Sequence, residues 1–509
     1  MQAGGRSVGR VAGGLALAAA LLAVPASADT LEEALAEAYE NNPTLLAARA
    51  QLRATDAGVA VEKAAGRPNV SADGTYTEFL QQNQASFISP DRLFRGGLNL
   101  GVPIYQGGAV KNAVRAAETR VEAGRADLRG TESAIFSQVV AAYMDVLRGQ
   151  ALVSLAQNQV DVLLVNVRAT SDRFEIGDLT RTDVAQSQSR LALAEGDLRT
   201  AQSNLIAARE DYIALVGEAP TNLQPPPPLP NLPNDLQVAV DVALANNPDL
   251  IADRERAEAA GYDIRIAGAG RLPRVSLFTG YDYQNFLGSR PDVVVDPDDP
   301  TAPIVAPPQV ARAAQAGVQF SIPLFQGGRP AALQRQAQAR SAAALENVVA
   351  TERDVIAQVR AAWASWQAAL AIIQSSQTAV EAAALSLEGV RAENSIGNRT
   401  ILEVLNAEQE LLNARVNLVT ARRNAYVAGF SLLAAMGRAE AQDLGFADGG
   451  LLYDPVINYD RVQGEFFDWA RDPDYETQAT RTVDVPAQTA DIPDPANAPE
   501  PDAELRPEP

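Results

Sequence analysis

The sequence contains no cysteine and no histidine among its 509 residues. Without cysteine, the chain has no disulfide framework, no thiolate metal site and no lipidated cysteine at a mature N-terminus. Without histidine, it lacks the commonest metal ligand and the usual general base. The remaining residues show no nucleophile–base or metal-binding arrangement. These absences argue against an enzyme, and we expect no catalytic residue, no cofactor and no metal site.

Positive charge is also scarce. Lysine and arginine total 42 against 63 aspartate and glutamate residues, so the formal net charge is −21. A nucleic-acid partner requires a basic face that neutralises phosphates, and this charge balance argues against one. The balance suits a soluble surface, or a lumen that disfavours anions.

The sequence has one long hydrophobic run, near its start. Residues 1–28 combine a short basic region, an apolar run over 11–24 and small residues up to Ala28. This is the plan of a secretory signal peptide, and the run is shorter than the roughly 20 residues of a spanning helix. We therefore expect cleavage after Ala28. We expect no transmembrane helix in the mature chain, although strands of roughly 9–11 alternating residues stay possible in a membrane.

Most of the mature chain repeats one plan twice. Three motifs recur in the same order: Leu31 to Asn42-Pro43 as Leu236 to Asn247-Pro248, Gly66-Arg67-Pro68 as Gly270-Arg271-Leu272-Pro273, and Pro103-Ile104-Tyr105-Gln106-Gly107-Gly108 as Pro323-Leu324-Phe325-Gln326-Gly327-Gly328. Such self-similarity indicates an internal structural repeat. We expect a first repeat over residues 29–218, a Pro-rich linker over 219–234 and a second repeat over 235–440. The chain then ends in a C-terminal segment over 441–483 and a disordered acidic, Pro/Ala-rich tail over 484–509.

Each repeat is predicted to contain one β-hairpin. Alternation and β-branched or aromatic residues predict strands over 70–79 and 97–104 in the first half, and over 275–286 and 316–324 in the second. Polar loops over about residues 80–96 and 287–315 join them. The second strand of each pair ends at Pro103 or Pro323, and the Gln-Gly-Gly after it lets the chain turn into a helix.

The rest of each repeat has a helical period. Apolar and small residues at alternating spacings of four and three run from Ile135 to Val167 and resume after a break at Gly177. The same pattern returns 220 residues later, with its break at Gly397. Sustained heptads predict coiled-coil packing. A helix over residues 109–173 would be roughly 100 Å long at 1.5 Å per residue, which fits a rod or a tube and not a globular domain.

Four strands per chain cannot close a barrel alone, and lipid does not tolerate open sheet edges. The chain must therefore associate. Two copies would form a filled barrel of eight strands, three copies an open one of twelve, and the residues alone do not decide between them.

The motifs resemble those of the TolC family of outer-membrane efflux and type I secretion channel proteins. The resemblance rests on the Gly-Arg-(Leu)-Pro corners, the Pro-to-Gly-Gly junctions, and the helix tips Phe174-Glu-Ile-Gly177 and Asn394-Ser-Ile-Gly397. It covers about residues 29–440, in order and in both repeats.

The resemblance implies a mostly α-helical homotrimer with a small β part. Its four strands per chain would form a 12-stranded barrel in outer-membrane lipid, above a long coiled-coil α-helical barrel in the periplasm. Such proteins export proteins or small toxic compounds with a periplasmic adaptor and an inner-membrane ABC, RND or MFS transporter. The alternative is a structural periplasmic coiled-coil protein without channel activity, against which the two β-hairpins argue.

The resemblance also implies a periplasmic gate at the second helix tip. The family often has two acidic residues a turn apart there, and these positions fall on Glu403 and Asn406 in this chain. Arg399 matches the family's gating arginine, Asp183 is the first-repeat equivalent of Glu403, and the family's tyrosine falls on Asn394. Acidic residues near a helix start are also explained by the helix dipole alone, which leaves that simpler interpretation open.

Overall fold

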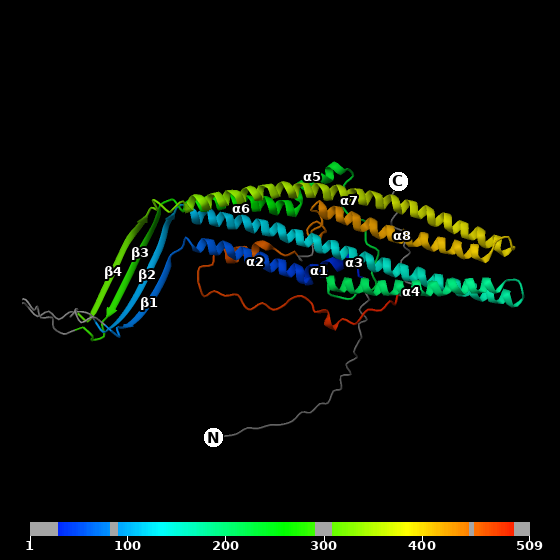
Figure 1. The fold of residues 1–509 in the computed structure, drawn as a ribbon, viewed down its shortest axis with the longest axis horizontal. Coiled ribbons are helices and arrows are strands. Elements are labelled where there is room, and N and C mark those ends of the chain that lie inside the picture. Colours follow the sequence, from blue (N-terminus) through cyan, green and yellow to red (C-terminus); the bar gives the residue numbers. More distant parts are fainter. Residues whose placement is uncertain (1–28, 82–89, 291–307, 447–451, 493–509) are drawn as a thin grey trace, which may run out of the picture.

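The computed structural model describes residues 29–81, 90–290, 308–446 and 452–492. The expected signal peptide, the tips of both hairpin loops and residues 493–509 of the expected acidic tail lie outside the described residues. Within them the fold is a long rod, with a β-sheet at one end and two helical hairpins reaching the other (Figure 1).

The two halves repeat the same order of elements. The first half contains α1 Leu31–Asn41, α2 Pro43–Ala64, β1 Asn69–Glu78, β2 Arg92–Gln106, α3 Ala109–Glu175 and α4 Arg181–Val216. The second contains α5 Leu236–Asn246, α6 Pro248–Ala269, β3 Arg274–Asn285, β4 Val310–Ser321, α7 Arg329–Ser395 and α8 Ile401–Ala435, before the short α9 Pro455–Val462. The expected long helices are confirmed, since α3 and α7 each span 67 residues, or about 100 Å.

The repeated Asn-Asn-Pro motif builds the joint between the two short helices of each half. The side-chain oxygen of Asn42 accepts the backbone N–H groups that open α2, and that of Asn247 does the same for α6. The amide nitrogen of each asparagine also donates across the fold, to Leu215 O at 2.9 Å and to Ala435 O at 3.1 Å. Each asparagine therefore caps one helix and binds the C-terminal end of another.

The four strands form one antiparallel sheet in the order β1-β2-β3-β4. The expected starts of the second strands were wrong, because β2 begins at Arg92 and β4 at Val310. Cross-strand pairing reaches further than the local sequence indicates, as in the pair Glu78 with Arg92. The expected ends differ as well: β2 continues through Pro103 to Gln106 because the ladder with β3 has an irregularity between Pro103 and Tyr105, and β4 stops at Ser321, before Pro323.

The core lies along α3, where the expected heptad seam is buried. Tyr143 is completely buried, and its hydroxyl donates to the carbonyl oxygens of Asp29 and Gln224 at 2.9 and 2.7 Å. This residue joins the start of α1 and the Pro-rich linker to the middle of α3. One 18-residue window of α3 is apolar enough to cross a membrane by composition, but 44% of it is buried inside the protein, as in the core helix of a helical bundle.

Candidate functional site

The sheet has two chemically different faces. Alternation along each strand and pairing across the ladder place apolar side chains on one face: Val70, Ala72, Tyr76, Phe94, Leu98, Leu100, Leu277, Tyr281, Val318 and Phe320. The other face carries Ser71, Asp73, Thr75, Arg95, Asn99, Asp282, Gln284, Gln315 and Gln319. Val70 is 68% exposed and Val318 is 64% exposed, so the apolar face is not covered within the chain. A sheet of this kind separates an apolar medium from an aqueous one.

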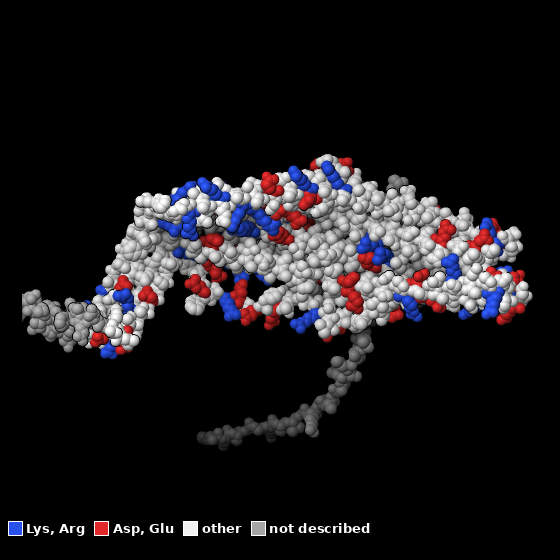
Figure 2. All heavy atoms as spheres, viewed as in Figure 1, with Lys and Arg blue, Asp and Glu red and all other residues white. Residues whose placement is uncertain are grey.

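Glycines on the polar face make room for side chains that lie across the ladder. Asn99 Nδ2 donates to Asp73 Oδ1 at 3.2 Å. A Cβ at Gly97 would lie 2.7 Å from that carboxylate, and a Cβ at Gly280 would lie 2.9 Å from Asn99 Oδ1. Charged side chains gather at the loop end of the sheet, and its middle shows few on the face drawn in Figure 2.

The strand-to-helix corners are built from the paired glycines that the sequence singles out. All four have positive φ: 63° at Gly107, 79° at Gly108, 59° at Gly327 and 81° at Gly328. Such angles favour glycine, and a Cβ at Gly107 would also meet Leu272 Cβ at 2.8 Å. The corners therefore direct α3 and α7 away from the sheet.

Arg399 lies in the turn between α7 and α8, where its guanidinium contacts two carboxylates. Nε donates to Glu393 Oε2 and Nη1 to Glu403 Oε1, both at 2.6 Å. Glu393 is near the end of α7 and Glu403 is in the first turn of α8, so the arginine connects the two helices of the hairpin. Hydrogen bonds to Glu393 and then to Glu403 raise the pKa of Arg399 above its ordinary value.

Glu403 also completes a capping box with Thr400. The Thr400 backbone N–H donates to Glu403 Oε2 at 2.8 Å, and the Thr400 hydroxyl lies 3.0 Å from the same oxygen. The backbone N–H of Thr400, followed by Arg399 and the Thr400 hydroxyl, lowers the pKa of Glu403 to about 2. This carboxylate therefore stays ionised at every physiological pH and serves both the helix start and the ion pair.

Asn394 contributes to the same turn. Its Nδ2 donates to the backbone oxygen of Arg399 at 2.7 Å, across Gly397, whose φ is 81°. The amide thus contacts the backbone of the arginine and not its guanidinium. Arg399, Glu403, Asn394 and Gly397 form one local cluster, as their spacing in the sequence indicates.

The first helix tip, between α3 and α4, is built in the same way as the second. It does not contact Arg399 within one chain. Gly177 has a φ of 83°. Asp183 completes a capping box with Thr180, and the hydroxyl and backbone N–H of Thr180 lower the pKa of Asp183. The local arginine here is Arg173, whose Nε donates to Asp178 Oδ2 at 2.7 Å.

Asn406 lies one turn after Glu403 and links the two hairpins. Its Oδ1 accepts a hydrogen bond of 2.8 Å from Arg190 Nη2 of α4. The Asn406 side chain therefore makes a contact with Arg190 that an acidic residue at this position could also make. Arg190 was not among the residues expected from the sequence, because its contact with Asn406 spans 216 positions.

A buried carboxylate behind the tip was also not predicted from the sequence. The side chain of Glu408 is 2% exposed and lies among α3, α7 and α8. Its oxygens accept from Asn166 Nδ2 at 3.1 and 3.0 Å and from Arg391 Nη2 at 3.0 Å. The only signal in the sequence was an acidic residue four positions after Val404, beside the α8 seam.

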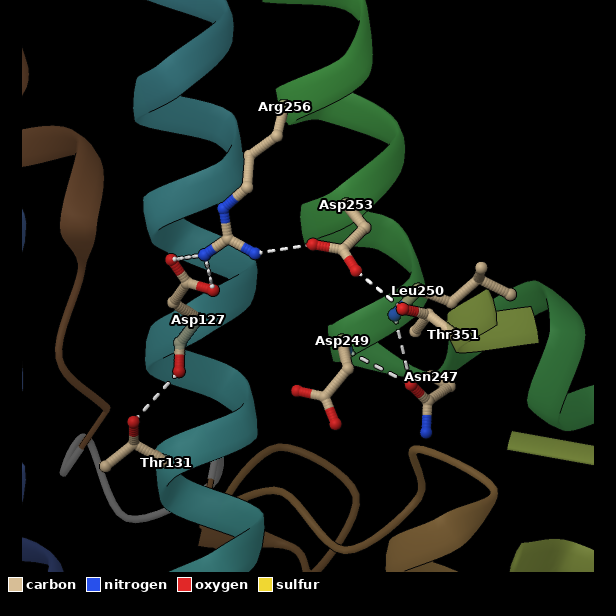
Figure 3. A network of polar contacts seen from close by, with 8 residues as sticks. All are labelled: Asp127, Thr131, Asn247, Asp249, Leu250, Asp253, Arg256 and Thr351. Atoms are coloured by element: carbon tan, nitrogen blue, oxygen red, sulfur yellow. Dashed lines mark hydrogen bonds and ion pairs between the residues drawn. The ribbon is translucent and has the colours of Figure 1, made fainter. Parts of the chain in front are cut away.

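A third polar network joins the repeats nearer the sheet (Figure 3). Arg256 of α6 binds both carboxylate oxygens of Asp127 on α3 at 2.6 Å. It also donates to Asp253 at 2.8 Å, and Asp253 accepts from the Thr351 hydroxyl of α7 at 2.6 Å. The network fixes α6 between the two long helices.

Comparison with known proteins agrees with this architecture. The family model described as "Outer membrane efflux protein" matches residues 34–218 and 239–438. The outer membrane efflux protein BepC of Brucella suis is 32% identical over 442 residues, which cover 87% of this chain and 92% of BepC. The outer membrane protein TolC of Vibrio cholerae is 26% identical, with 83% of this chain and 94% of TolC covered.

A solved structure supports the fold. The CmeC outer membrane channel of Campylobacter jejuni superposes with a TM-score of 0.70 at 17% identity, and the match covers 85% of this chain and 89% of CmeC. The duplicated helical hairpins, the two-faced sheet and the match over both repeats lead to one conclusion. The chain belongs to the outer membrane efflux protein (TolC) family, whose members are outer-membrane channels for efflux and secretion and are not enzymes.

Proposed function

We propose that three copies of this chain close into one continuous export duct, gated at its periplasmic tip by the Arg399 cluster. The observation that carries the proposal is that the equivalent helices α3 and α7 are buried to very different extents. Twenty-one residues of α3 are buried, against six of α7, although both helices span 67 residues. Apolar side chains stay exposed along α7, including Leu345 at 58%, Ile372 at 53% and Leu385 at 70%.

The internal repeat supplies the missing neighbours of α7. Within the chain, α3 packs against α6 and α8 of the second half, and β2 pairs with β3. The equivalent contacts of α7 would be with α2 and α4 of a second copy, and β4 would pair with its β1. Since each copy offers both surfaces, repetition of the contact closes a ring and leaves no sheet edge in the lipid.

A ring of three copies agrees best with the two-faced sheet. Twelve strands enclose an open lumen, whereas eight enclose only enough space for side chains. The polar face would line that lumen and the apolar face would meet lipid. The aspartates of the polar face and the net charge of −21 favour cations over anions in the lumen.

The proposed gate is the tip at the end of α7 and α8. Arg399 with Glu393 and Glu403 fixes the α7–α8 turn, and the Arg190–Asn406 bond ties this hairpin to α4. Releasing these bonds frees the second hairpin to move away from the axis. In a ring, Asp183 of one copy would also approach the Arg399 cluster of a neighbour, where the acidic charge would add to the network.

The cargo and partners follow from the family and not from a pocket in the chain. We propose that the duct exports small toxic compounds or proteins delivered by an inner-membrane transporter of the ABC, RND or MFS class, through a periplasmic adaptor. The missing lipidation cysteine favours the secretion or multipurpose branch over a dedicated drug-efflux duct.

Conductance in a planar bilayer tests the duct and the gate together. We expect discrete, cation-preferring openings from the purified protein, and larger openings from Arg399→Ala because the α7–α8 turn is released. The matched control is Arg120→Ala, which removes an equally exposed ion pair with Asp263 between α3 and α6, away from the tip. This control should conduct like the wild type.

Three results would contradict parts of the proposal. No channel activity from folded protein would support the structural coiled-coil alternative. If the openings of Arg399→Ala equal those of the wild type, the proposed gate is contradicted and the proposed duct is still supported. Larger openings of both variants would assign the effect to general loosening of the helices.

A further inference from the structure

An aromatic turn lies just after α9 and is not used by the proposed duct. Phe466, Phe467 and Trp469 are 63%, 76% and 96% exposed. The two phenylalanine rings pack edge to face, with their centroids 5.7 Å apart. We refer to residues 465–469 as the aromatic turn. Three large aromatic side chains gathered on a surface mark a site that another medium or molecule covers.

The aromatic turn is fixed to the end of α2 nearest the sheet. Lys63 Nζ donates to Gln463 Oε1 at 3.0 Å, and the guanidinium of Arg67 donates to the backbone oxygen of Glu465. The same guanidinium lies over the Phe466 ring, 5.6 Å from its centroid. Since β1 begins at Asn69, two residues after Arg67, the turn lies level with the start of the sheet (Figure 1).

Apolar side chains continue from the sheet at this same level. Val70 at the start of β1 is 68% exposed, and Ile104 and Tyr105 near the end of β2 are 58% and 47% exposed. These residues lie at the helix-side end of the strands, where the wall that faces lipid gives way to the periplasmic helices. The aromatic turn and these exposed apolar side chains of the sheet therefore lie at the same level along the rod.

We propose that the aromatic turn is a membrane anchor, inserted into the lipid headgroup region of the leaflet that faces the periplasm. The inference rests on the proposed function, because it uses the membrane position of the sheet. Tryptophan and other aromatic side chains concentrate at membrane–water interfaces, where one part of the ring system is in apolar surroundings and another meets polar groups.

The charges around the turn agree with shallow insertion. Lys63 and Arg67 place positive charge beside the aromatic rings, where lipid phosphates would lie. Asp468 stands between Phe467 and Trp469, and a carboxylate is too costly to bury among acyl chains. The anchor therefore reaches the headgroups, whereas the chain after it runs back along α2, away from the sheet and the membrane.

Fluorescence of Trp469 tests the anchor in the full-length protein. The protein is reconstituted into phosphatidylcholine vesicles with brominated acyl chains, and Trp469 emission is obtained by subtracting the spectrum of a Trp469→Phe variant. We expect brominated lipid to quench most of this emission, and aqueous acrylamide to quench little of it.

Two further variants on the Trp469→Phe background serve as references. Tyr475→Trp moves the probe along the same segment to a residue whose ring lies beneath the Arg53 guanidinium, about 20 Å further from the sheet along α2. It should be quenched by acrylamide and not by brominated lipid. Tyr281→Trp reports from the apolar face of the sheet and should be quenched by brominated lipid.

The outcomes separate the anchor from the proposed function. Quenching of Trp469 by acrylamide alone would place the turn in water, and quenching by neither agent would place it against a neighbouring copy. Either result overturns the anchor while Tyr281→Trp is still quenched by brominated lipid. If brominated lipid fails to quench Tyr281→Trp, the membrane position of the sheet is wrong, and both proposals fall.

Discussion

At the scale of single residues, this rod has exposed ion pairs, such as Arg399 with Glu403, and also carboxylates that are buried between helices. Glu132 on α3 is a buried carboxylate, at 8% exposure. It faces Arg49 of α2, together with Arg129, Glu440 and the backbone of Ala441. Burial is the largest cause that raises the pKa of Glu132 to about 7 from an ordinary value of 4.5, and Arg49 opposes this rise.

This raised pKa makes stability depend on pH near neutrality. Below about pH 4.5 the carboxyl is protonated in both the folded and unfolded chain and carries no penalty. As the pH rises towards and through 7, the unfolded chain has already lost its proton, and the folded state is destabilised by up to about 3 kcal/mol.

Thermal unfolding of Glu132→Gln checks this expectation. The variant cannot ionise, so its Tm should exceed that of the wild type at about pH 8 and equal it at about pH 4. Glu388→Gln is the control and should leave both values unchanged, because Glu388 on α7 is exposed and its equivalent on α3, Arg168, is exposed as well. A Tm gain of the same size at both pH values would point to packing and not to ionisation.

At the scale of elements, each half depends on a joint between its short and long helices. Asn42 and Asn247 fulfil the same two tasks in the two repeats, since each caps a helix and binds the end of another. The duplication thus provides a matched pair of sites with the same chemistry in different surroundings.

Substitution of these asparagines should weaken both joints similarly. In Asn42→Ala and Asn247→Ala we expect a loss of about 1–2 kcal/mol each, because a cap is removed and a carbonyl at the end of α4 or α8 loses its donor. Hydrogen exchange of the first amides of α2 and α6 should become faster in the respective variant. Protection that stays unchanged would show that the cap contributes little beside the packing of the helices.

At the scale of the whole molecule, the proposed ring requires a contact between copies, and the repeat specifies one. Gly130 of α3 lies against Asp249 of α6, since a Cβ there would be 3.3 Å from the carboxylate oxygen. The equivalent positions are Ala350 on α7 and Thr44 on α2, both exposed in the single chain. They would be neighbours only across a boundary between copies.

Engineered cysteines can test this contact, because the chain has no cysteine of its own. Ala350→Cys combined with Thr44→Cys should form disulfides between copies on oxidation, seen as a ladder on a non-reducing gel. Three linked chains as the largest product would establish the ring of three, whereas two would establish a pair. Each single variant is the control and should give no ladder; absence of cross-linking in the double variant would contradict the ring.

Much of the fold could be predicted because its signals are local. Neighbouring residues determine the heptads, the helix breaks at Gly177 and Gly397, and the Gly-Gly corners. They also determine the cluster of Arg399, Glu403 and Asn394. The start of β2 at Arg92 was missed because strand pairing with β1, and not the local composition, determines where that strand begins.

The sequence by itself determined the duplication, the lengths of the long helices and the residues of the local tip cluster. Only the tertiary structure decided that Arg190 binds Asn406 and that Asn166 and Arg391 surround the buried Glu408. It also decided that the aromatic turn lies beside Arg67, 398 positions away in the sequence. Periodicity and capping act between residues a few positions apart, whereas these contacts depend on how the long helices pack against one another.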